Sequence, residues 1–193
     1  MKQLVLIGAL LGSAAGACGA TDDRPRNLEY ITQTILAPTC AAAECHSAFK
    51  REVGDEFDTV DATRRTIVNN GLVNPGNPGS SVLYTSITIG APSILSPGST
   101  VRMPFDAPMP DADVALIAAW IQDGAPGAQC LANDQGNGCS VTGTGAGRVY
   151  HVVQCVDGNI GAVVMDCPLA DPASNKQQSV CSTTTGNGQC TKQ

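Results

Sequence analysis

The stretch Cys40-Ala41-Ala42-Ala43-Glu44-Cys45-His46 carries the densest chemistry of this sequence, because two thiols are followed directly by an imidazole. Two cysteines ahead of a histidine are what covalent attachment of a haem requires. Each thiol would add to one vinyl group of the porphyrin, and the adjacent histidine would reach the iron through Nε2. The stretch therefore predicts a c-type haem site, with Cys40 and Cys45 as attachment points and His46 as axial ligand.

The spacing within this stretch is longer than usual, since four residues separate the two cysteines instead of two. Positions i and i+5 of a helix lie on different faces, so residues 41–44 must bulge out of any helical turn. Three alanines make such a bulge sterically feasible. The alternative is a disulfide between Cys40 and Cys45 that closes a small loop, with His46 as an ordinary surface residue.

The first seventeen residues have the features of an export signal peptide. Lys2 supplies a positive start, residues 4–11 are mostly apolar, and residues 12–17 are small. The apolar stretch is too short to span a bilayer as a helix. We therefore expect cleavage after residue 17, a location in the cell envelope (periplasm or outer membrane), and no transmembrane segment in the mature protein.

Cys18 would then be the first mature residue, as in bacterial lipoproteins. The nine cysteines divide without remainder if Cys18 carries lipid, two hold haem and six form three disulfides. Ala15 departs from the leucine preferred in lipoprotein signals, so ordinary secretion remains the alternative. Residues 18–27 are polar and are predicted to form a tether.

The charge of the chain limits its partners. The formal net charge is −6 at pH 7, which disfavours binding to nucleic acid or to anionic lipid headgroups. A redox partner protein is expected to be basic, and contact with a membrane is expected only through the lipid anchor.

Hydrophobic periodicity predicts several short helices before residue 126. Apolar residues recur at helical spacing in residues 28–36, where Pro38 is expected to end the helix. Further helices are predicted at 62–70 and from residue 82 after a Pro-Gly-rich turn. The clearest helix covers residues 111–123, which Gly124 terminates.

Residues 101–110 form a proline-rich stretch that contains Met103 and Met109. A thioether held on a stiff loop suits the sixth position of haem iron, because it is a soft, neutral ligand that favours the reduced metal. The alternative is a purely structural role, in which either methionine fills a gap in the hydrophobic core. If His46 and a methionine both bind iron, no position stays open for a substrate, which favours an electron carrier over an enzyme.

Together these motifs resemble the cytochrome c-like domains of bacterial exported proteins, often described as planctomycete-type cytochrome c. The resemblance covers about residues 28–126 and rests on the cysteine motif together with residues 73–78, 81–84, 102–104 and 120–125. It implies a mainly α, helical haem domain with one haem c per chain. It also implies that Met103, in its Arg-Met-Pro context, is the distal ligand, with His46 opposite.

The composition changes after residue 127, and residues 130–193 are predicted to form a small disulfide-rich β module. Such a segment is too short to bury much apolar surface, so six cysteines would staple it. Residues 149–155 and 160–167 alternate like two strands around an Asp-Gly turn, which predicts a hairpin containing His151 as a strand residue. The alternative to disulfides is a zinc site, but no two of these cysteines are close in sequence. The six cysteines are Cys130, Cys139, Cys155, Cys167, Cys181 and Cys190.

The sequence therefore predicts a mainly α fold with a cytochrome c-like haem domain and a β module that folds separately and does not tune the haem. The predicted function is electron transfer by an exported, lipid-anchored monohaem cytochrome. Two alternatives stay open at this point. One is a non-catalytic surface lipoprotein or binding module that has lost haem and keeps a Cys40–Cys45 disulfide; the other is a haem enzyme or gas sensor.

Overall fold

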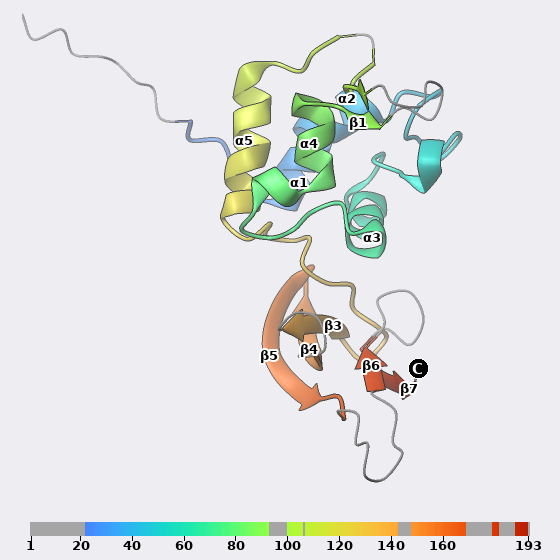
Figure 1. The fold of residues 1–193 in the computed structure, drawn as a ribbon, viewed down its shortest axis with the longest axis vertical. Coiled ribbons are helices and arrows are strands. Elements are labelled where there is room, and N and C mark those ends of the chain that lie inside the picture. Colours follow the sequence, from blue (N-terminus) through green and yellow to red (C-terminus); the bar gives the residue numbers. More distant parts are fainter. Residues whose placement is uncertain are drawn as a thin grey trace, which may run out of the picture.

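The computed structural model describes residues 22–92, 100–105, 107–142, 148–168, 179–181 and 188–192. Helices gather in the part of the chain before residue 126, and longer strands follow it (Figure 1). The predicted signal peptide, residues 1–17, and the predicted lipidation site Cys18 lie outside the described residues. No helix among the described residues is long and apolar enough to cross a membrane.

The chain first forms a continuous helical run that ends at the cysteine motif. The run consists of α1 (Leu28–Ile31), the π-helix η1 (Thr32–Leu36) and α2 (Ala37–Cys40). Asn27 caps its start, because its side chain accepts a hydrogen bond from the Tyr30 backbone N–H. The prediction that Pro38 ends the helix is wrong. The Ala37 N–H bonds to the Thr32 carbonyl, five residues back, and this wider turn accommodates the proline ring within α2.

The remaining elements of the helical part include the helices predicted at 62–70, from residue 82 and at 111–123, and these three are confirmed. In chain order, the remaining elements are the 3₁₀ turn η2 (Glu52–Gly54), α3 (Val60–Asn70), the 3₁₀ turn η3 (Pro78–Ser80), α4 (Val82–Thr88), the short strands β1 (Ala91–Pro92) and β2 (Thr100–Val101), and α5 (Asp111–Gln122). Thr59 caps α3 by accepting from the Ala62 N–H, and Gly71 ends it with a left-handed φ of 62°.

Trp120 on α5 is the largest side chain of the helical core and is fully buried. Its Nε1–H donates to the Pro126 carbonyl at 3.1 Å, and the same carbonyl accepts the Leu28 backbone N–H at 3.1 Å. The beginning of α1 is thereby joined to the end of α5. Further buried members of this core are Ile31, Ile35, Leu36, Ile67, Leu83, Ile87, Met109, Leu116, Ile117 and Ile121.

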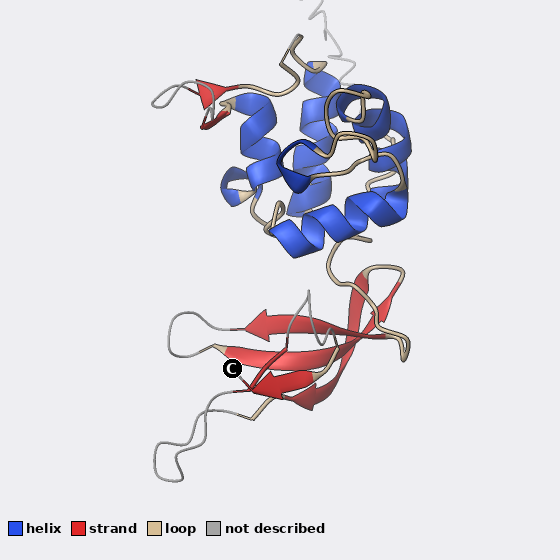
Figure 2. Ribbon diagram, turned by 90° about the vertical axis from the view of Figure 1, so that its right-hand side faces the viewer, coloured by secondary structure: helices blue, strands red, loops and turns tan. Residues whose placement is uncertain are grey.

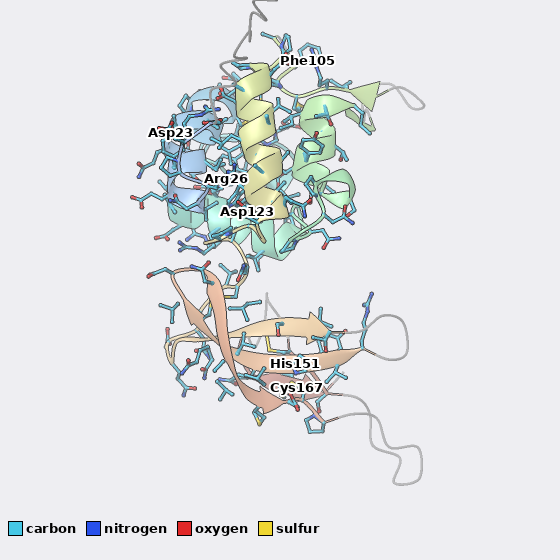
Figure 3. The ribbon with its side chains drawn as sticks, turned by 90° about the vertical axis from the view of Figure 1, so that its left-hand side faces the viewer. Asp23, Arg26, Phe105, Asp123, His151 and Cys167 are labelled. Atoms are coloured by element: carbon cyan, nitrogen blue, oxygen red, sulfur yellow. A yellow bond between two sulfur atoms is a disulfide. The ribbon has the colours of Figure 1, made fainter. Side chains whose placement is uncertain are left out.

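The described part of the predicted tether, residues 22–27, lies against α5. The Arg24 guanidinium donates to the Asp113 carboxylate at 2.5 Å and to the Ala112 carbonyl at 2.7 Å. Arg26 pairs with Asp123 at 3.1 Å near the other end of the helix (Figure 3). Arg24 and Arg26 therefore attach this segment along α5. Its polar composition alone did not distinguish it from a free linker.

The later part of the chain is built on a three-stranded antiparallel sheet in the order β3-β4-β5. Its strands are β3 (Asn137–Thr142), β4 (Val149–Val156) and β5 (Asn159–Asp166), and a separate pair consists of β6 (Ser179–Cys181) and β7 (Cys190–Lys192). The predicted hairpin is confirmed as β4–β5. Asp157 and Gly158 form its two-residue turn with φ values of 50° and 78°, as a type I′ turn requires.

Three disulfides hold this β module together, as the cysteine count predicted. They join Cys130 to Cys155, Cys139 to Cys181, and Cys167 to Cys190. All six cysteines are thus paired within the module, so zinc binding by their thiolates does not apply. Chain-entropy arguments assign roughly 2 to 4 kcal/mol to each such crosslink, which offsets the small apolar interior of the module.

The expectation of a mainly α, cytochrome c-like fold is wrong. The longest helix has 12 residues, whereas β4 and β5 have eight residues each and belong to a three-stranded sheet. Apart from the two-residue strands β1 and β2, helices and strands occupy different parts of the molecule (Figure 2), so the chain is of the α+β type. The error arose because helical periodicity before residue 126 received more weight than the extent of the β module.

The β4–β5 turn connects the β module to the helical part. The Gly158 carbonyl accepts the backbone N–H groups of Gln129 and Cys130 at 2.7 and 3.2 Å. The Gly127 N–H donates to the Asn159 side chain at 2.7 Å, and the Gly127 carbonyl accepts from Arg64 Nε of α3 at 2.8 Å. We call this set of contacts the junction. It places a turn of the module directly against the segment that leaves α5.

The junction predicts that Gly158→Ala destabilises the protein more than Gly136→Ala. Both glycines have a left-handed φ, 78° and 76°, so both substitutions carry the backbone cost of about 1 to 2 kcal/mol. A Cβ at 158 would also overlap the Gly127 carbonyl and Arg64, whereas a Cβ at 136 meets nothing within 4 Å. Thermal unfolding followed by circular dichroism should therefore give the lower Tm for Gly158→Ala. Equal Tm values would contradict the junction.

Candidate functional site

The cysteine motif forms a closed loop at the end of α2. The His46 backbone N–H donates to the Cys40 carbonyl at 3.1 Å, and the Cys45 N–H donates to the Ala42 carbonyl at 2.8 Å. The residues between Ala42 and Cys45 are exposed. The predicted bulge is therefore confirmed, and the longer spacer leaves the backbone of His46 directly beside that of Cys40.

His46 is held in place by hydrogen bonds at three positions. Besides its N–H bond to Cys40, its carbonyl accepts the Phe57 N–H at 2.9 Å, and its ring atom Nδ1 lies 3.1 Å from the Glu52 carbonyl. A carbonyl can only accept, so Nδ1 carries the proton and the Nε2 lone pair is left for a metal. The Phe57 ring packs edge-on against the imidazole, with centroids 5.4 Å apart.

The turn that supplies the Glu52 carbonyl is strained. Arg51 and Val53 have φ values of 49° and 52°, in the left-handed region. A residue branched at Cβ, such as Val53, rarely adopts this conformation. Backbone strain of this kind costs of order 1 to 3 kcal/mol and gathers at functional sites. Here the strained turn η2 aims a carbonyl at the His46 ring. An ion pair between Arg51 and Glu56 at 2.9 Å fastens it.

The two thiols of the motif are free and differ in environment. Cys40 is partly buried against the helical core, whereas Cys45 is exposed. Burial, together with the nearby Cys45 thiolate, raises the pKa of the Cys40 thiol to about 12. Cys40 is therefore a neutral thiol at neutral pH.

The two methionines of residues 101–110 take different places. Met109 is buried in the helical core with an exposed fraction of 5%. Met103 is partly buried at the edge of the same core, as are Cys40 and Ala41, and its N–H donates to the Ser86 carbonyl of α4 at 2.9 Å. Met109 is thus a core residue, and Met103 is the methionine whose thioether a bound group could reach.

Large apolar side chains are exposed next to the motif and next to Met103. Phe49 and Val53 follow the motif with exposed fractions of 83% and 66%, and Phe105 follows Met103 with 79%. Phe105 projects from the end of the helical part that is remote from the β module (Figure 3). Aromatic side chains normally bury most of their surface, so these positions suit contact with an apolar group.

Among the described residues, no three histidine, cysteine, aspartate or glutamate side chains lie close enough to hold a metal ion between them. His46 and Met103 lie within the described residues, and Cys40 and Cys45 are brought close to His46 by the closed loop. The sequence did not reveal the Glu52 carbonyl as the partner of Nδ1. Only the sharp change of backbone direction around Arg51 and Val53 brings it there.

The β module contains an arrangement of side chains that the sequence analysis missed. His151 lies on β4 directly opposite Asp166 of β5, and Thr142 at the end of β3 reaches its other side. His151 Nδ1 is 2.7 Å from Asp166 Oδ1, and His151 Nε2 is 2.7 Å from Thr142 Oγ1. Residues 142, 151 and 166 share no sequence motif, so the strand register was needed to find them.

Comparison with known proteins adds no relative. No family model, curated protein or solved structure matches this chain. The functional argument therefore rests on the residues themselves.

In haem-free protein, we predict that iodoacetamide alkylates Cys45 at least about tenfold faster than Cys40 at pH 8, because the thiolate is the nucleophile and the raised pKa keeps Cys40 protonated. Raising the pH toward 12 should accelerate the Cys40 reaction, because its thiolate then forms. Peptide mass spectrometry after timed quenching measures both rates, and urea-unfolded protein is the control in which they converge. Equal rates in folded protein would show that Cys40 is not buried.

Proposed function

We propose that this protein is an exported monohaem c-type cytochrome that transfers electrons. The observation that carries the proposal is the hydrogen bond between His46 Nδ1 and the Glu52 carbonyl. Metal-binding histidines commonly donate their second ring N–H to a carbonyl or carboxylate, which fixes the tautomer and turns the other nitrogen toward the metal.

The thiols fit covalent attachment. Cys40 and Cys45 are free, they flank the closed loop, and the loop keeps His46 next to Cys40 despite the four-residue spacer. In this proposal both thiols would hold the porphyrin through thioether bonds, and His46 and Met103 would bind the iron. When bound, the haem supplies a centre that accepts and releases one electron. The Glu52 carbonyl holds the His46 ring in a fixed orientation.

The exposed apolar side chains support a large apolar partner at this place. Phe49 and Val53 lie three and seven residues after His46, and Phe105 lies two residues after Met103. Full burial of such a side chain is worth about 1.5 to 3 kcal/mol. Contact with a porphyrin would remove part of this apolar surface from water and so provide part of that free energy.

The cellular setting proposed here is the cell envelope. Disulfides persist in oxidising compartments, and the module holds three of them. We propose lipid attachment at Cys18 and, given the net charge of −6, a basic redox partner protein.

The first test is covalent attachment. Protein from a host that matures c-type cytochromes should retain haem after denaturing electrophoresis, seen by in-gel peroxidase staining. The double variant Cys40→Ala/Cys45→Ala should lose the stain, because no thioether remains. A stainless band for the unmodified chain, or a stain that survives in the double variant, would overturn the proposal.

The second test separates the two methionines. Ferric haem with histidine and methionine ligands has a weak charge-transfer band at the red edge of the visible spectrum. We expect Met103→Leu to abolish this band and Met109→Leu to keep it while lowering the free energy of unfolding by up to about 1.5 kcal/mol, as for other core swaps of similar volume. Loss of the band only in Met109→Leu would reverse the assignment.

A further inference from the structure

Three side chains on adjacent strands of the β module form a continuous hydrogen-bonded line. Thr142 Oγ1, His151 and Asp166 Oδ1 are joined by two contacts of 2.7 Å each, one to each ring nitrogen of the histidine. Asp166 is the residue opposite His151 in the β4–β5 register, and Thr142 is its diagonal neighbour on β3. Figure 3 shows His151 on the strands of the module, outside the helical part of the molecule.

The partners of the imidazole fix its chemistry. An ionised carboxylate can only accept, so Nδ1 carries the proton and donates to Asp166. In the neutral imidazole Nε2 is then an acceptor, and the Thr142 hydroxyl donates to it. The hydroxyl of Thr142 is therefore hydrogen-bonded to a base whose orientation a third group sets, which is the arrangement that activates a nucleophilic oxygen.

Exposure of these residues matches the roles. Only 14% of the His151 side chain is exposed, which keeps the ring oriented. Thr142 is exposed, so a substrate can reach its oxygen. Asp166 is 69% exposed, and its carboxylate therefore positions the ring with little added electrostatic strength.

We propose that Thr142, His151 and Asp166 form an acyl-transfer site for carboxylic esters, separate from the proposed electron transfer. Thr142 Oγ forms a bond to the ester carbonyl carbon while its proton passes to His151 Nε2. The carbon–oxygen bond to the alcohol breaks, and the alcohol leaves with that proton. Water then attacks the acylated threonine, His151 takes its proton and returns it to Thr142 Oγ, and the carboxylic acid leaves.

The groups present in this line, a nucleophile, a base and a positioning carboxylate, limit the kind of ester. Esters with a small acyl group and a stable alcohol leaving group fit best, because they need least stabilisation beyond the general base. General-base assistance contributes roughly 10²- to 10⁴-fold to such reactions. Asp166 is a positioning residue in this scheme, and Thr142 and His151 are the catalytic residues.

The test uses the full chain and p-nitrophenyl acetate. Release of p-nitrophenolate should begin with a burst, and peptide mass spectrometry after an acid quench should locate an acetyl group on Thr142. We expect Thr142→Ala to abolish that adduct and His151→Gln to slow its formation at least tenfold, with a smaller loss for Asp166→Asn. Ser140→Ala is the matched control, because Ser140 lies opposite His151 on β3 and has no role in the step.

Two further measurements keep the outcome clear. Circular dichroism checks that each variant folds, and Thr142→Ser, which retains a hydroxyl, should be acetylated at least as fast as the unchanged chain. An acetyl group on Ser140 instead of Thr142, no adduct on folded protein, or acetylation of Thr142 at the same rate in His151→Gln would each overturn the proposal.

Discussion

The Pro126 carbonyl is the single acceptor on which the assembly of this chain depends. It receives the first backbone N–H of α1 and the indole N–H of Trp120, at 3.1 Å each. A buried indole N–H without a partner would cost about 1 to 3 kcal/mol, so this bond permits a tryptophan to sit at the centre of the core. The next residue, Gly127, begins the junction with the β4–β5 turn. One short segment therefore closes the helical core and attaches the β module.

The chain uses two different sources of stability on the two sides of this segment. The helical part buries a group of aliphatic residues around Trp120, whereas the described part of the module buries Val152 and Val153 beside its cysteines. The module therefore relies on its three crosslinks, which act chiefly by restricting the unfolded chain. Reduction of the disulfides removes that restriction from the module alone. Because Arg64 on α3 donates a hydrogen bond to the Gly127 carbonyl at the junction, unfolding of the module would also disturb this contact.

Local patterns predicted local structure well and arrangement poorly. Apolar spacing located α3, α4 and α5, the Asp-Gly turn located the hairpin, and cysteine parity confined the disulfides to the module. Pro38 was misjudged, because a π turn lets a helix continue where an α turn cannot. The fold class was misjudged for a different reason, since β3 was not predicted and only the β4–β5 hairpin was recognised in the sheet. The Glu52 carbonyl and the line through His151 escaped prediction because each depends on backbone geometry that no residue type encodes.

The position of the cysteine motif relative to the core bears on how a haem could be added. Trp120, Ile117 and Ile121 are fully buried by the chain's own side chains. The motif, Phe49 and Phe105 lie outside that closed core, on loops that the helices support. A folded helical part can therefore present Cys45 in solution before attachment, while burial protects Cys40. In the proposed attachment Cys45 is the more accessible of the two thiols, whereas burial raises the pKa of the Cys40 thiol.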